Sequence, residues 1–584
     1  MVRVLPDQPA INKPFDYLVP DSLGGQVHLG TQVRIALHGR RVGGWVVDDD
    51  VEPPVGVALR PLAKVTGWGP SSDVIDLARW ASWRWAGRPA QFLRTASADG
   101  AVRVLPPTGR AGPPIHDPDD DLVTEAMSQE RAVLRLPPAA DRYPVALAAA
   151  ARGNALILVP SLSAARHLGL RLRRAGLPVA ILPRDWAQAR AGSVVVGSRA
   201  AAWAPVQDLA AVVVFDEHDE SWQQEQAPTW HARDVAIERA RRAGVPCIVV
   251  SPMPSLEALS WGQLVAPSRA AERDGWPMVD VIDRRDEEPT RGGLFSERLV
   301  TALRSGGRVV CVLNRTGRSR LLACTACGET ARCERCDAAV LLTDERLFSC
   351  RRCGTTRPPT CLACGATAFK NLRAGVTRVR EELEALARVP VVEVTKAGSG
   401  AASAGSAGAP LPDAQVYIGT EAALHQIESA EVVAFLDFDQ ELLAPRYRAA
   451  EEALALLVRA GRLVGGRRGG GRVLVQTRLP QHEVVQAALL GDPARVSNAE
   501  AERRAILRFP PVSAMATVSG PSAPAFIERL GVTLAAGPGG VEVLGPSEDQ
   551  WLVRAATHTV LLDALAATER PPGRLRVVVD PLRL

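Results

Sequence analysis

Four Cys-x-x-Cys pairs lie within about forty residues of this chain, and they constrain its folding more than any other feature. The pairs are Cys324/Cys327, Cys333/Cys336, Cys350/Cys353 and Cys361/Cys364. Two such pairs can place four thiolates around one zinc ion, at Zn–S distances of about 2.3 Å, and leave no position for a substrate. The eight cysteines therefore predict two zinc ions that build shape and perform no chemistry.

The loop lengths predict which pairs share an ion. A zinc ribbon usually needs roughly 15–20 residues between its two pairs. Thirteen residues separate Cys336 from Cys350, whereas only five separate Cys327 from Cys333. A disulfide cluster is the alternative, and a reducing compartment disfavours it. We therefore expect two nested zinc sites, an inner one of Cys333, Cys336, Cys350 and Cys353 and an outer one of Cys324, Cys327, Cys361 and Cys364.

Length and composition set broad limits. The N-terminal residues lack the apolar core of a secretion signal, and no run of about 20 apolar residues is present to span a bilayer. We therefore expect a cytoplasmic protein with no membrane partner. A length of 584 residues exceeds what one hydrophobic core supports and predicts three to five domains. The 69 Lys and Arg residues only slightly outnumber the 64 Asp and Glu residues, so the charge permits a polyanionic partner without requiring one.

The first hundred residues change in character along the chain. Residues 1–66 contain short strand-like runs broken by Gly and Pro, which predicts a small β-rich domain. Residues 67–105 have a helical, aromatic pattern, which suits a winged-helix-like domain. A linker rich in Pro, Gly and Asp is expected over residues 106–120.

The remaining chain alternates between apolar runs and helical segments over residues 121–275 and again over 276–495. This alternation predicts two lobes, each a parallel sheet with crossover helices. The cysteines fall inside the second lobe, so we expect a zinc module over 320–368 as an insertion there. A surface loop is expected over Ala397–Pro410, and a C-terminal α+β domain over 496–584. The predicted fold class is multidomain α/β.

This order of modules resembles the PriA family of primosomal replication-restart helicases, which belong to superfamily 2. The resemblance covers nearly the whole chain and implies two RecA-like lobes. It also implies a set of partners: forked and single-stranded DNA, restart primosome components, the replicative helicase and single-stranded DNA-binding protein. The segments that look like family signatures, in the expected order, are Val196–Arg199, Pro228–Asp234, Pro254–Glu257, Leu313–Gly317, Ile418–Thr420 and Phe509–Pro511.

The resemblance also implies a site for the 3′ end of a nascent DNA strand. Phe15, Asp16 and Tyr17 occupy the family's end-binding position, and Gly39 and Lys64 look like the matching close-approach glycine and phosphate-facing lysine. A base can stack on an aromatic ring while a carboxylate accepts hydrogen bonds from the sugar hydroxyls, an arrangement that recognises an end and not a sequence. An alternative stays open, because aromatic residues two apart are also typical of a strand core.

The nucleotide motifs of a motor are degenerate. A phosphate loop needs the pattern Gly-x-x-x-x-Gly-Lys-Ser/Thr, which is absent from this sequence. In its place Pro137 and Pro138 lack N–H donors, Arg142 could at most replace the lysine's charge, and Tyr143 is a poor substitute for the magnesium-binding hydroxyl. The acidic box that follows the apolar run Val212–Val214 reads Asp216-Glu217-His218, with Phe215 where the family has its first metal-binding Asp.

The coupling and arginine-finger motifs of the family are altered as well, to Ser251-Pro-Met-Pro254 and to Arg459–Arg467. Phosphoryl transfer depends mostly on positioning and charge stabilisation by these parts. We therefore expect a replication-restart protein that binds stalled or branched forks and initiates primosome assembly without helicase activity, with no catalytic residue and a doubtful ATP/Mg²⁺ site. The alternatives are an active ATP-dependent 3′–5′ helicase and a zinc-ribbon interaction scaffold.

Overall fold

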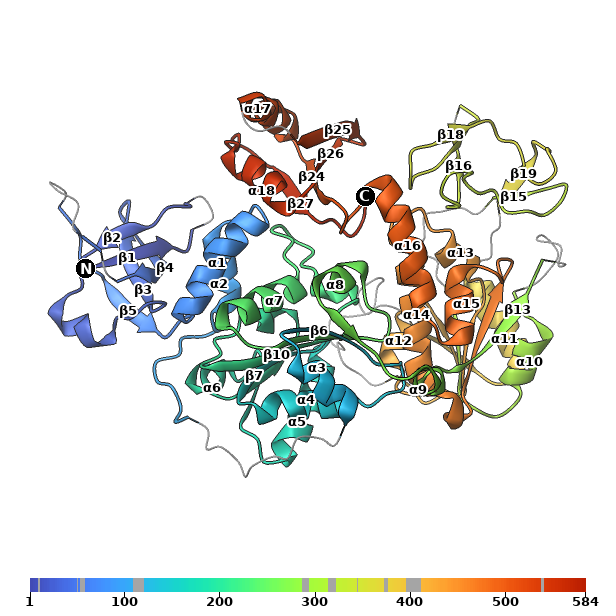
Figure 1. Cartoon of the computed structure of the whole chain (residues 1–584), viewed down its shortest axis with the longest axis horizontal. Coiled ribbons are helices and arrows are strands. Elements are labelled where there is room, and N and C mark those ends of the chain that lie inside the picture. Colours follow the sequence, from blue (N-terminus) through green and yellow to red (C-terminus); the bar gives the residue numbers. More distant parts are fainter. Residues whose placement is uncertain are drawn as a thin grey trace. The chain divides into compact units, whose positions relative to one another are not determined.

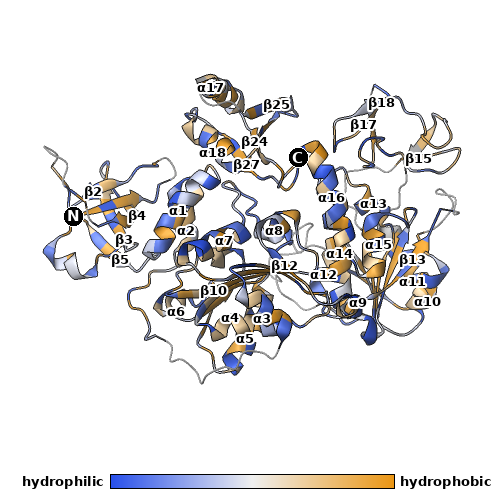
Figure 2. Ribbon diagram, in the orientation of Figure 1, coloured by the Kyte–Doolittle hydropathy of each residue, from blue (hydrophilic) through white to orange (hydrophobic). Residues whose placement is uncertain are grey.

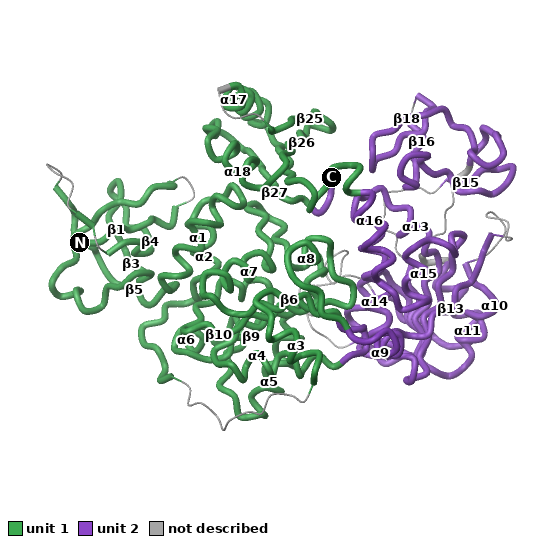
Figure 3. Tube along the Cα trace, in the orientation of Figure 1, with its two compact units in different colours: residues 1–135, 141–266, 504–581 green, residues 136–140, 267–503, 582–584 purple. Residues whose placement is uncertain are grey.

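The computed structural model describes two compact units (Figure 3). Unit 1 contains residues 1–135, 141–266 and 504–581, and unit 2 contains residues 136–140, 267–503 and 582–584. The predicted loop at 397–410 and residues 109–119 of the predicted linker lie outside the described residues. The structure describes the whole chain except residues 9–10, 50, 53–57, 109–119, 286–293, 314–321, 344, 372–375, 395–410 and 537–539.

Unit 1 begins with a five-stranded antiparallel sheet in the order β2-β1-β4-β3-β5. Along β3 the buried residues Val33 and Ile35 alternate with exposed Arg34, the pattern of a strand with one face on a core. Leu18 links the two outer strands, since it donates to the Arg60 carbonyl at 3.0 Å and accepts from the Leu62 amide at 2.9 Å. This link closes the sheet on itself. The strands are β1 (Val2–Pro6), β2 (Phe15–Tyr17), β3 (Gln32–Leu37), β4 (Arg40–Asp48) and β5 (Lys64–Gly67), with a 3₁₀ turn η1 (Asp21–Gln26).

Two helices follow, α1 (Ser72–Arg84) and α2 (Pro89–Ala96). The buried residues of α1 recur at helical spacing, and Pro89 at the first turn of α2 suits a position that needs no N–H. Both helices join one hydrophobic core with the first lobe, in which Phe92 packs 5.2 Å from Trp203, centroid to centroid. Among the described residues of 67–105 these are the only helices, and the winged-helix comparison stays a prediction.

The first lobe is a seven-stranded parallel sheet in the order β12-β6-β11-β10-β7-β9-β8, as predicted from the apolar runs. Figure 2 shows hydrophobic residues along the central strands, which is expected for strands covered on both faces. The strands are β6 (Arg131–Arg135), β7 (Asn154–Leu158), β8 (Val179–Ile181), β9 (Val194–Gly197), β10 (Leu209–Phe215), β11 (Cys247–Ser251) and β12 (Gln263–Val265). The helices are α3 (Asp121–Ser128), α4 (Tyr143–Ala151), α5 (Leu162–Arg174), α6 (Trp186–Ala191), α7 (Ala232–Ala243) and α8 (Leu256–Trp261), with 3₁₀ turns η2 (Arg199–Trp203) and η3 (Glu220–Trp222).

The C-terminal part of unit 1 is an antiparallel sheet in the order β25-β26-β24-β27 with two helices (Figure 1). The predicted boundary at residue 496 falls inside a continuous helix, α16 (Ala494–Leu507), and the chain passes from unit 2 to unit 1 at Arg504. The helix has no Gly or Pro that would mark a break at 496. The elements are β24 (Ala514–Ser519), α17 (Ala523–Ala536), β25 (Val541–Ser547), β26 (Gln550–Ala555), α18 (His558–Ala567) and β27 (Arg576–Val579).

Unit 2 contains the second lobe, a six-stranded parallel sheet in the order β13-β23-β22-β14-β21-β20. The strands are β13 (Met278–Asp283), β14 (Val309–Val312), β20 (Val391–Val394), β21 (Val416–Gly419), β22 (Val432–Phe435) and β23 (Arg472–Thr477). The helices are α9 (Arg269–Gly275), α10 (Glu297–Leu303), α11 (Val376–Ala387), α12 (Ala423–Gln426), α13 (Asp439–Leu442), α14 (Ala449–Val464) and α15 (Glu483–Leu490), besides the 3₁₀ turn η4 (Arg467–Gly469). Two RecA-like parallel sheets are therefore present, as the fold class predicted.

The cysteine-rich segment forms its own small module between β14 and α11. It is made of short antiparallel strands in two small sheets, β15 with β19 and β16-β17-β18. The strands of the module are β15 (Leu322–Cys324), β16 (Leu341–Leu342), β17 (Phe348–Ser349), β18 (Thr356–Arg357) and β19 (Phe369–Asn371).

Within the parts of the chain that the structure describes, no helix is long and apolar enough to cross a membrane.

Candidate functional site

Each Cys-x-x-Cys pair sits in the same kind of tight turn. The first cysteine's carbonyl accepts a hydrogen bond from the amide four residues later, at 2.9–3.0 Å in all four turns. The residue that donates has a positive φ, which favours glycine. Glycine stands there in three turns, and Asp337 takes that place in the fourth. The donors are Gly328 (φ 76), Asp337 (φ 57), Gly354 (φ 74) and Gly365 (φ 77).

The turns bring the eight sulfurs into two groups of four, each with all ligand atoms within 4.8 Å of one another. These are the nested groups that the loop lengths predict. The sulfur contacts within the groups are 3.5–3.6 Å. A tetrahedron with metal–sulfur bonds of about 2.3 Å has edges of about 3.8 Å, whereas a disulfide bond is about 2.05 Å long. The spacing therefore fits four thiolates around one metal ion and does not fit disulfides.

The inner group is fixed to the second lobe by Arg352, which lies between two of its cysteines. Arg352 Nη2 lies 3.4 Å from Glu500 Oε1 on α16 and 3.4 Å from the Tyr447 carbonyl oxygen. The side chains of Arg352 and Glu500 are 6% and 0% exposed, so this is a buried ion pair. Beside it, the Ala339 amide donates to the Leu443 carbonyl at 2.8 Å. A metal ion in the inner group would therefore stabilise the Cys350–Cys353 turn, whose Arg352 also contacts Tyr447 and Glu500.

The remaining cysteines, Cys247 on β11 and Cys311 on β14, are buried in the two parallel sheets. Burial raises the pKa of the Cys311 thiol to about 12 and that of Cys247 further still. Neither belongs to a group of metal-binding residues in the described chain. They are core residues without the thiolate character that reactivity requires.

The predicted end-binding residues Phe15, Asp16 and Tyr17 make up strand β2. Side chains alternate across a strand, so Asp16 faces the side opposite to the two aromatic rings. Tyr17 is buried, and its hydroxyl donates to the Ala36 carbonyl at 3.1 Å. Burial raises the pKa of the Tyr17 hydroxyl, while nearby Arg60 lowers it by less. Tyr17 therefore belongs to the core of the sheet, whereas Phe15 is only half-buried.

Asp16 is paired with Arg3, a residue that the sequence did not single out. The strand register sets the two residues opposite each other, and Arg3 Nε donates to Asp16 Oδ1 at 2.8 Å. Arg3 also lies 3.6 Å from Asp48. The Asp16 side chain is 18% exposed, so it can still be reached from solvent. A sugar hydroxyl that binds Asp16 would share it with Arg3.

Gly39 and Lys64 lie elsewhere on the same sheet. Gly39 has φ +77 in the turn between β3 and β4, with open space where a Cβ would stand. Lys64 is exposed at the start of β5 and lies opposite Arg34. The Leu18 link brings the chain after β2 beside the chain that precedes Lys64. The structure thus relates Lys64 to β2 through the chain that precedes it, whereas Gly39 lies in the β3–β4 turn.

At the degenerate nucleotide site the charged groups are paired with each other. Arg142, in the place of the phosphate-loop lysine, donates through Nη1 to Asp216 Oδ2 at 2.6 Å. The Asp216 side chain is only 5% exposed. Its backbone has a positive φ of 52°, and its carbonyl accepts from the Trp222 indole at 2.8 Å. A Mg²⁺ ion would have to displace Arg142 from Asp216, and a phosphate would have to displace Asp216 from Arg142.

The N-terminus of α4, where a phosphate would bind, carries a carboxylate of the chain itself. Asp141 Oδ1 accepts from the Tyr143 amide at 3.0 Å, and both its oxygens face Arg171 at 3.2–3.3 Å. Arg171 also stacks over the Tyr143 ring, 4.1 Å from its centroid. Burial alone would raise the pKa of Asp141, but the bonds from Arg171 and the Tyr143 amide hold it below the usual range. The anion site of this helix is therefore filled internally.

The proline pair packs within unit 2. The Ala139 amide donates to the Gly275 carbonyl at 3.1 Å, and a Cβ added to Gly275 would lie 2.4 Å from the Pro137 ring. Pro137 and Pro138 thus serve as packing residues and present no amide to a phosphate.

Glu217 and His218 are bound to neighbouring motif residues. Glu217 accepts from the Ser255 amide at 2.7 Å, the Ser255 hydroxyl at 2.8 Å and Arg233 Nη1 at 2.9 Å. His218 Nδ1 lies 2.7 Å from the Ser251 hydroxyl. Both Glu217 oxygens are therefore occupied, and the residue is 1% exposed. The residues present do not fit a Mg²⁺–nucleotide complex.

Comparisons with known proteins agree with the predicted resemblance. A family model of the 3'DNA-binding domain (3'BD) matches residues 3–98, which span the closed sheet and both helices after it. The replication restart protein PriA of Bacillus subtilis is 29% identical over 401 residues, covering 63% of this chain and 49% of that protein. The probable replication restart protein PriA of Mycobacterium tuberculosis is 29% identical over 567 residues, covering 88% and 85%.

The match to the Bacillus subtilis protein thus spans about half of its length, 49%. A solved DEAD box protein from Methanococcus jannaschii is 8% identical with a TM-score of 0.31, and it covers 64% of this chain and 88% of its own. The sequence matches confirm the resemblance to the PriA replication restart proteins.

Proposed function

We propose that this relative of the PriA replication restart proteins binds forked DNA at a free 3′ end and initiates assembly of a restart primosome, without ATP-driven unwinding. Its closed N-terminal sheet would hold the end. Two zinc ions would shape the Cys module, each held by one group of four cysteines. The partners, by family resemblance, would be primosome components, the replicative helicase and single-stranded DNA-binding protein.

One observation carries the inactive-motor part of the proposal. The anion site at the start of α4 holds Asp141, and the cation beside it, Arg142, is paired with Asp216. Separating Arg142 from the buried Asp216 carboxylate would cost free energy before any nucleotide was bound, because buried charges need partners. An ATP molecule would have to replace each contact with a better one. The missing Ser/Thr hydroxyl and the missing loop amides leave little to do so.

The first experiment measures both activities on the whole chain. We expect binding to forked DNA that weakens steeply with salt, because phosphate contacts release counterions. We expect no DNA-stimulated ATP hydrolysis. Turnover on the order of 1 s⁻¹ or faster, within the usual range for enzymes, together with strand unwinding would return the chain to the active helicases.

The second experiment tests the end site. Asp16→Ala should reduce the preference for a fork with a 3′ end at the branch over a fork without one, measured by fluorescence anisotropy. Asp48→Ala is the matched control, since Asp48 also lies near Arg3 but is not on β2. An equal preference for the 3′-end fork in wild type and Asp16→Ala would mean that β2 is part of the sheet core and does not bind the DNA end. Absence of fork binding altogether would favour an interaction scaffold.

A further inference from the structure

A continuous series of charged contacts crosses unit 1, beginning in its C-terminal part. His558, the first residue of α18, contacts both carboxylate oxygens of Asp580 at 2.9 Å through Nε2. Arg84, the last residue of α1, donates to Asp580 at 2.6 Å and to Asp234 on α7 at 3.2 Å. One guanidinium nitrogen thus connects α1 with α7 and with the residue that follows β27, three segments far apart in the sequence.

The series continues into the acidic box. Asp234 accepts from Arg233 Nε at 3.2 Å, and Arg233 Nη1 donates to Glu217 at 2.9 Å and to the Ser255 hydroxyl at 3.0 Å. Glu217 and Arg233 are 1% and 8% exposed. From Asp580 to Glu217, anions and cations alternate along the series, so each of these charges is compensated by its neighbours. Such alternation is what makes buried ionic groups tolerable.

The pKa shifts agree with this compensation. Burial alone would raise the pKa of Asp580, but Arg84 and His558 hold it far below its usual range. Burial would likewise raise the pKa of Asp234, and Arg233 leads the charges that lower it. Both carboxyls are therefore ionised at neutral pH and attract the same arginine.

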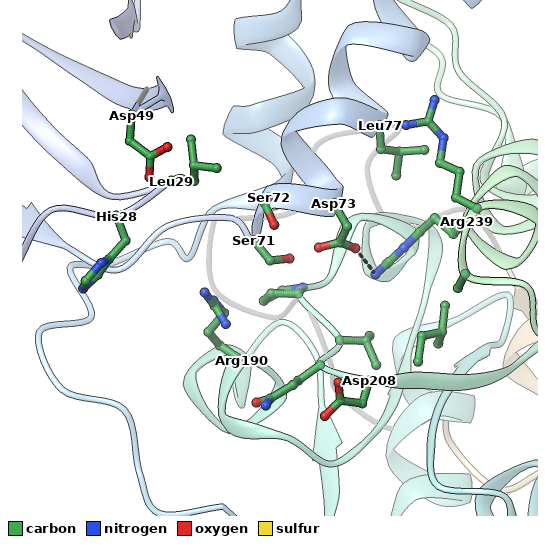
Figure 4. A pocket seen from close by; sticks show the side chains of 16 residues that line it. His28, Leu29, Asp49, Ser71, Ser72, Asp73, Leu77, Arg190, Asp208 and Arg239 are labelled. Carbon is green, nitrogen blue, oxygen red and sulfur yellow. Dashed lines mark hydrogen bonds and ion pairs between the residues drawn. The ribbon is translucent and has the colours of Figure 1, made fainter. Parts of the chain in front are cut away.

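Helices α1 and α7 are joined by ion pairs at both ends. Arg84 and Asp234 form one pair, at the end of α1 and the start of α7. At the opposite ends Arg239 lies 3.4 Å from Asp73, at the rim of a cavity of about 610 Å³ (Figure 4). Only the first pair connects onward to Asp580 and Glu217. The second offers a comparison within the same helix pair.

We propose that Glu217, Arg233 and Asp234 act as positioning residues that hold the C-terminal part of unit 1 in place through Arg84. In an active motor the acidic box serves a metal and a water molecule. In this chain the box and the Trp230–Asp234 segment have a structural role: Glu217 fixes Arg233, Arg233 fixes Asp234, and Asp234 shares Arg84 with Asp580. The proposal does not depend on DNA binding.

The test is amide hydrogen exchange on the full chain. Glu217→Gln keeps the shape of the side chain and removes its charge, and it should raise exchange in α18 and β27 on the order of tenfold, the scale of one lost charge-assisted hydrogen bond. Exchange in β8 and β9, at the far edge of the first-lobe sheet, should not change. Glu238→Gln is the matched control, because Glu238 lies on α7 but pairs with Arg241 and Arg242.

Variants of Arg84 test the same series of contacts independently of Glu217→Gln. Arg84→Met should raise exchange in α18 and β27 at least as much as Glu217→Gln, and Arg84→Lys should restore part of the protection. The double variant Glu217→Gln/Arg84→Met should show less than the sum of the two effects, as expected for residues in one network. The proposal is overturned by unchanged exchange in α18 and β27, by equal effects of Glu238→Gln, or by a rise that extends equally to β8 and β9.

Discussion

The Cys module and the acidic box after β10 are both places where a PriA-like chain is expected to hold a charged ligand, and their local structures are opposite. In the Cys module the ligand atoms face one another at 3.5–3.6 Å with no disulfide bond between them. At the acidic box, Arg142 is paired with Asp216, and Glu217 has three donors. One region is arranged so that it could hold an ion, and the charged groups of the other are paired with one another.

This difference separates two meanings of a retained motif. A site that still binds keeps groups of one charge together, because the ligand supplies the opposite charge. A site that no longer binds gains internal partners of the opposite charge. The four sulfurs of each group are arranged as the proposed zinc sites require, and Asp141, Arg142 and Asp216 are paired as the proposed loss of nucleotide binding requires. Counting motif residues alone does not distinguish the two cases.

Loss of metal is the largest effect that we expect. Cys333→Ser should lower the zinc content from two ions per chain to one, and strong chelation should unfold the Cys module, because structural zinc supplies roughly 10–16 kcal/mol in zinc-finger peptides. Elemental analysis and tryptic digestion of residues 322–371 would measure both. Cys247→Ser, a buried cysteine outside the groups, should keep two ions. A wild-type content of one zinc ion or none would contradict the interpretation that the Cys module is arranged to hold two metal ions.

A smaller effect is expected from Arg142→Ala. The variant leaves the buried Asp216 carboxylate without this cation and should lower the free energy of unfolding by about 1–3 kcal/mol. That is less than the roughly 3–5 kcal/mol for breaking a fully buried pair, since the Arg142 side chain is 39% exposed.

Urea unfolding and an ATP titration separate the two roles that Arg142 could have. Arg152→Ala is the control for Arg142→Ala, because Arg152 donates to a carbonyl and not to a carboxylate. A loss of ATP affinity with unchanged stability would assign Arg142 to a working nucleotide site. That result would contradict the interpretation that Arg142 is held by the chain itself at the acidic box.

The smallest effect concerns Asp141 and its dependence on pH. Its pKa in the folded chain lies below the ordinary 3.8, so its stabilising contribution is complete above that value and is lost as the pH falls through the lowered pKa. The difference in stability between wild type and Asp141→Asn should be constant from pH 7 to about pH 5 and shrink below about pH 4. It should stay under about 1 kcal/mol because the side chain is 60% exposed. A difference that grew on acidification would contradict the internal capping of α4.

The sequence could predict those parts of the fold that depend on local pattern. Apolar runs separated by helical segments predicted both parallel sheets, and the spacing of Cys327, Cys333, Cys336 and Cys350 predicted the nested grouping. In each case the decisive information lies within a few tens of residues. Chain connectivity then leaves few arrangements.

The contacts of the candidate sites depend on pairs that no local pattern encodes. Arg3 meets Asp16 because of a strand register, and Arg84 meets Asp580 across 496 residues of sequence. Position 496, where the sequence predicts a domain boundary, lies inside helix α16, and the burial of Tyr17 could not be decided from a three-residue strand. Burial and long-range charge pairing are properties of the folded chain.

The closure of the first sheet by Leu18 has a consequence for handling the chain. An open sheet presents unpaired N–H and C=O groups along its outer strands, which invite pairing with another molecule. Here the chain beyond β2 is paired with the chain before β5, through the Arg60 carbonyl and the Leu62 amide. Less of the sheet's edge remains for intermolecular pairing. The N-terminal sheet should therefore resist aggregation through strand addition, even at the high concentrations that spectroscopy requires.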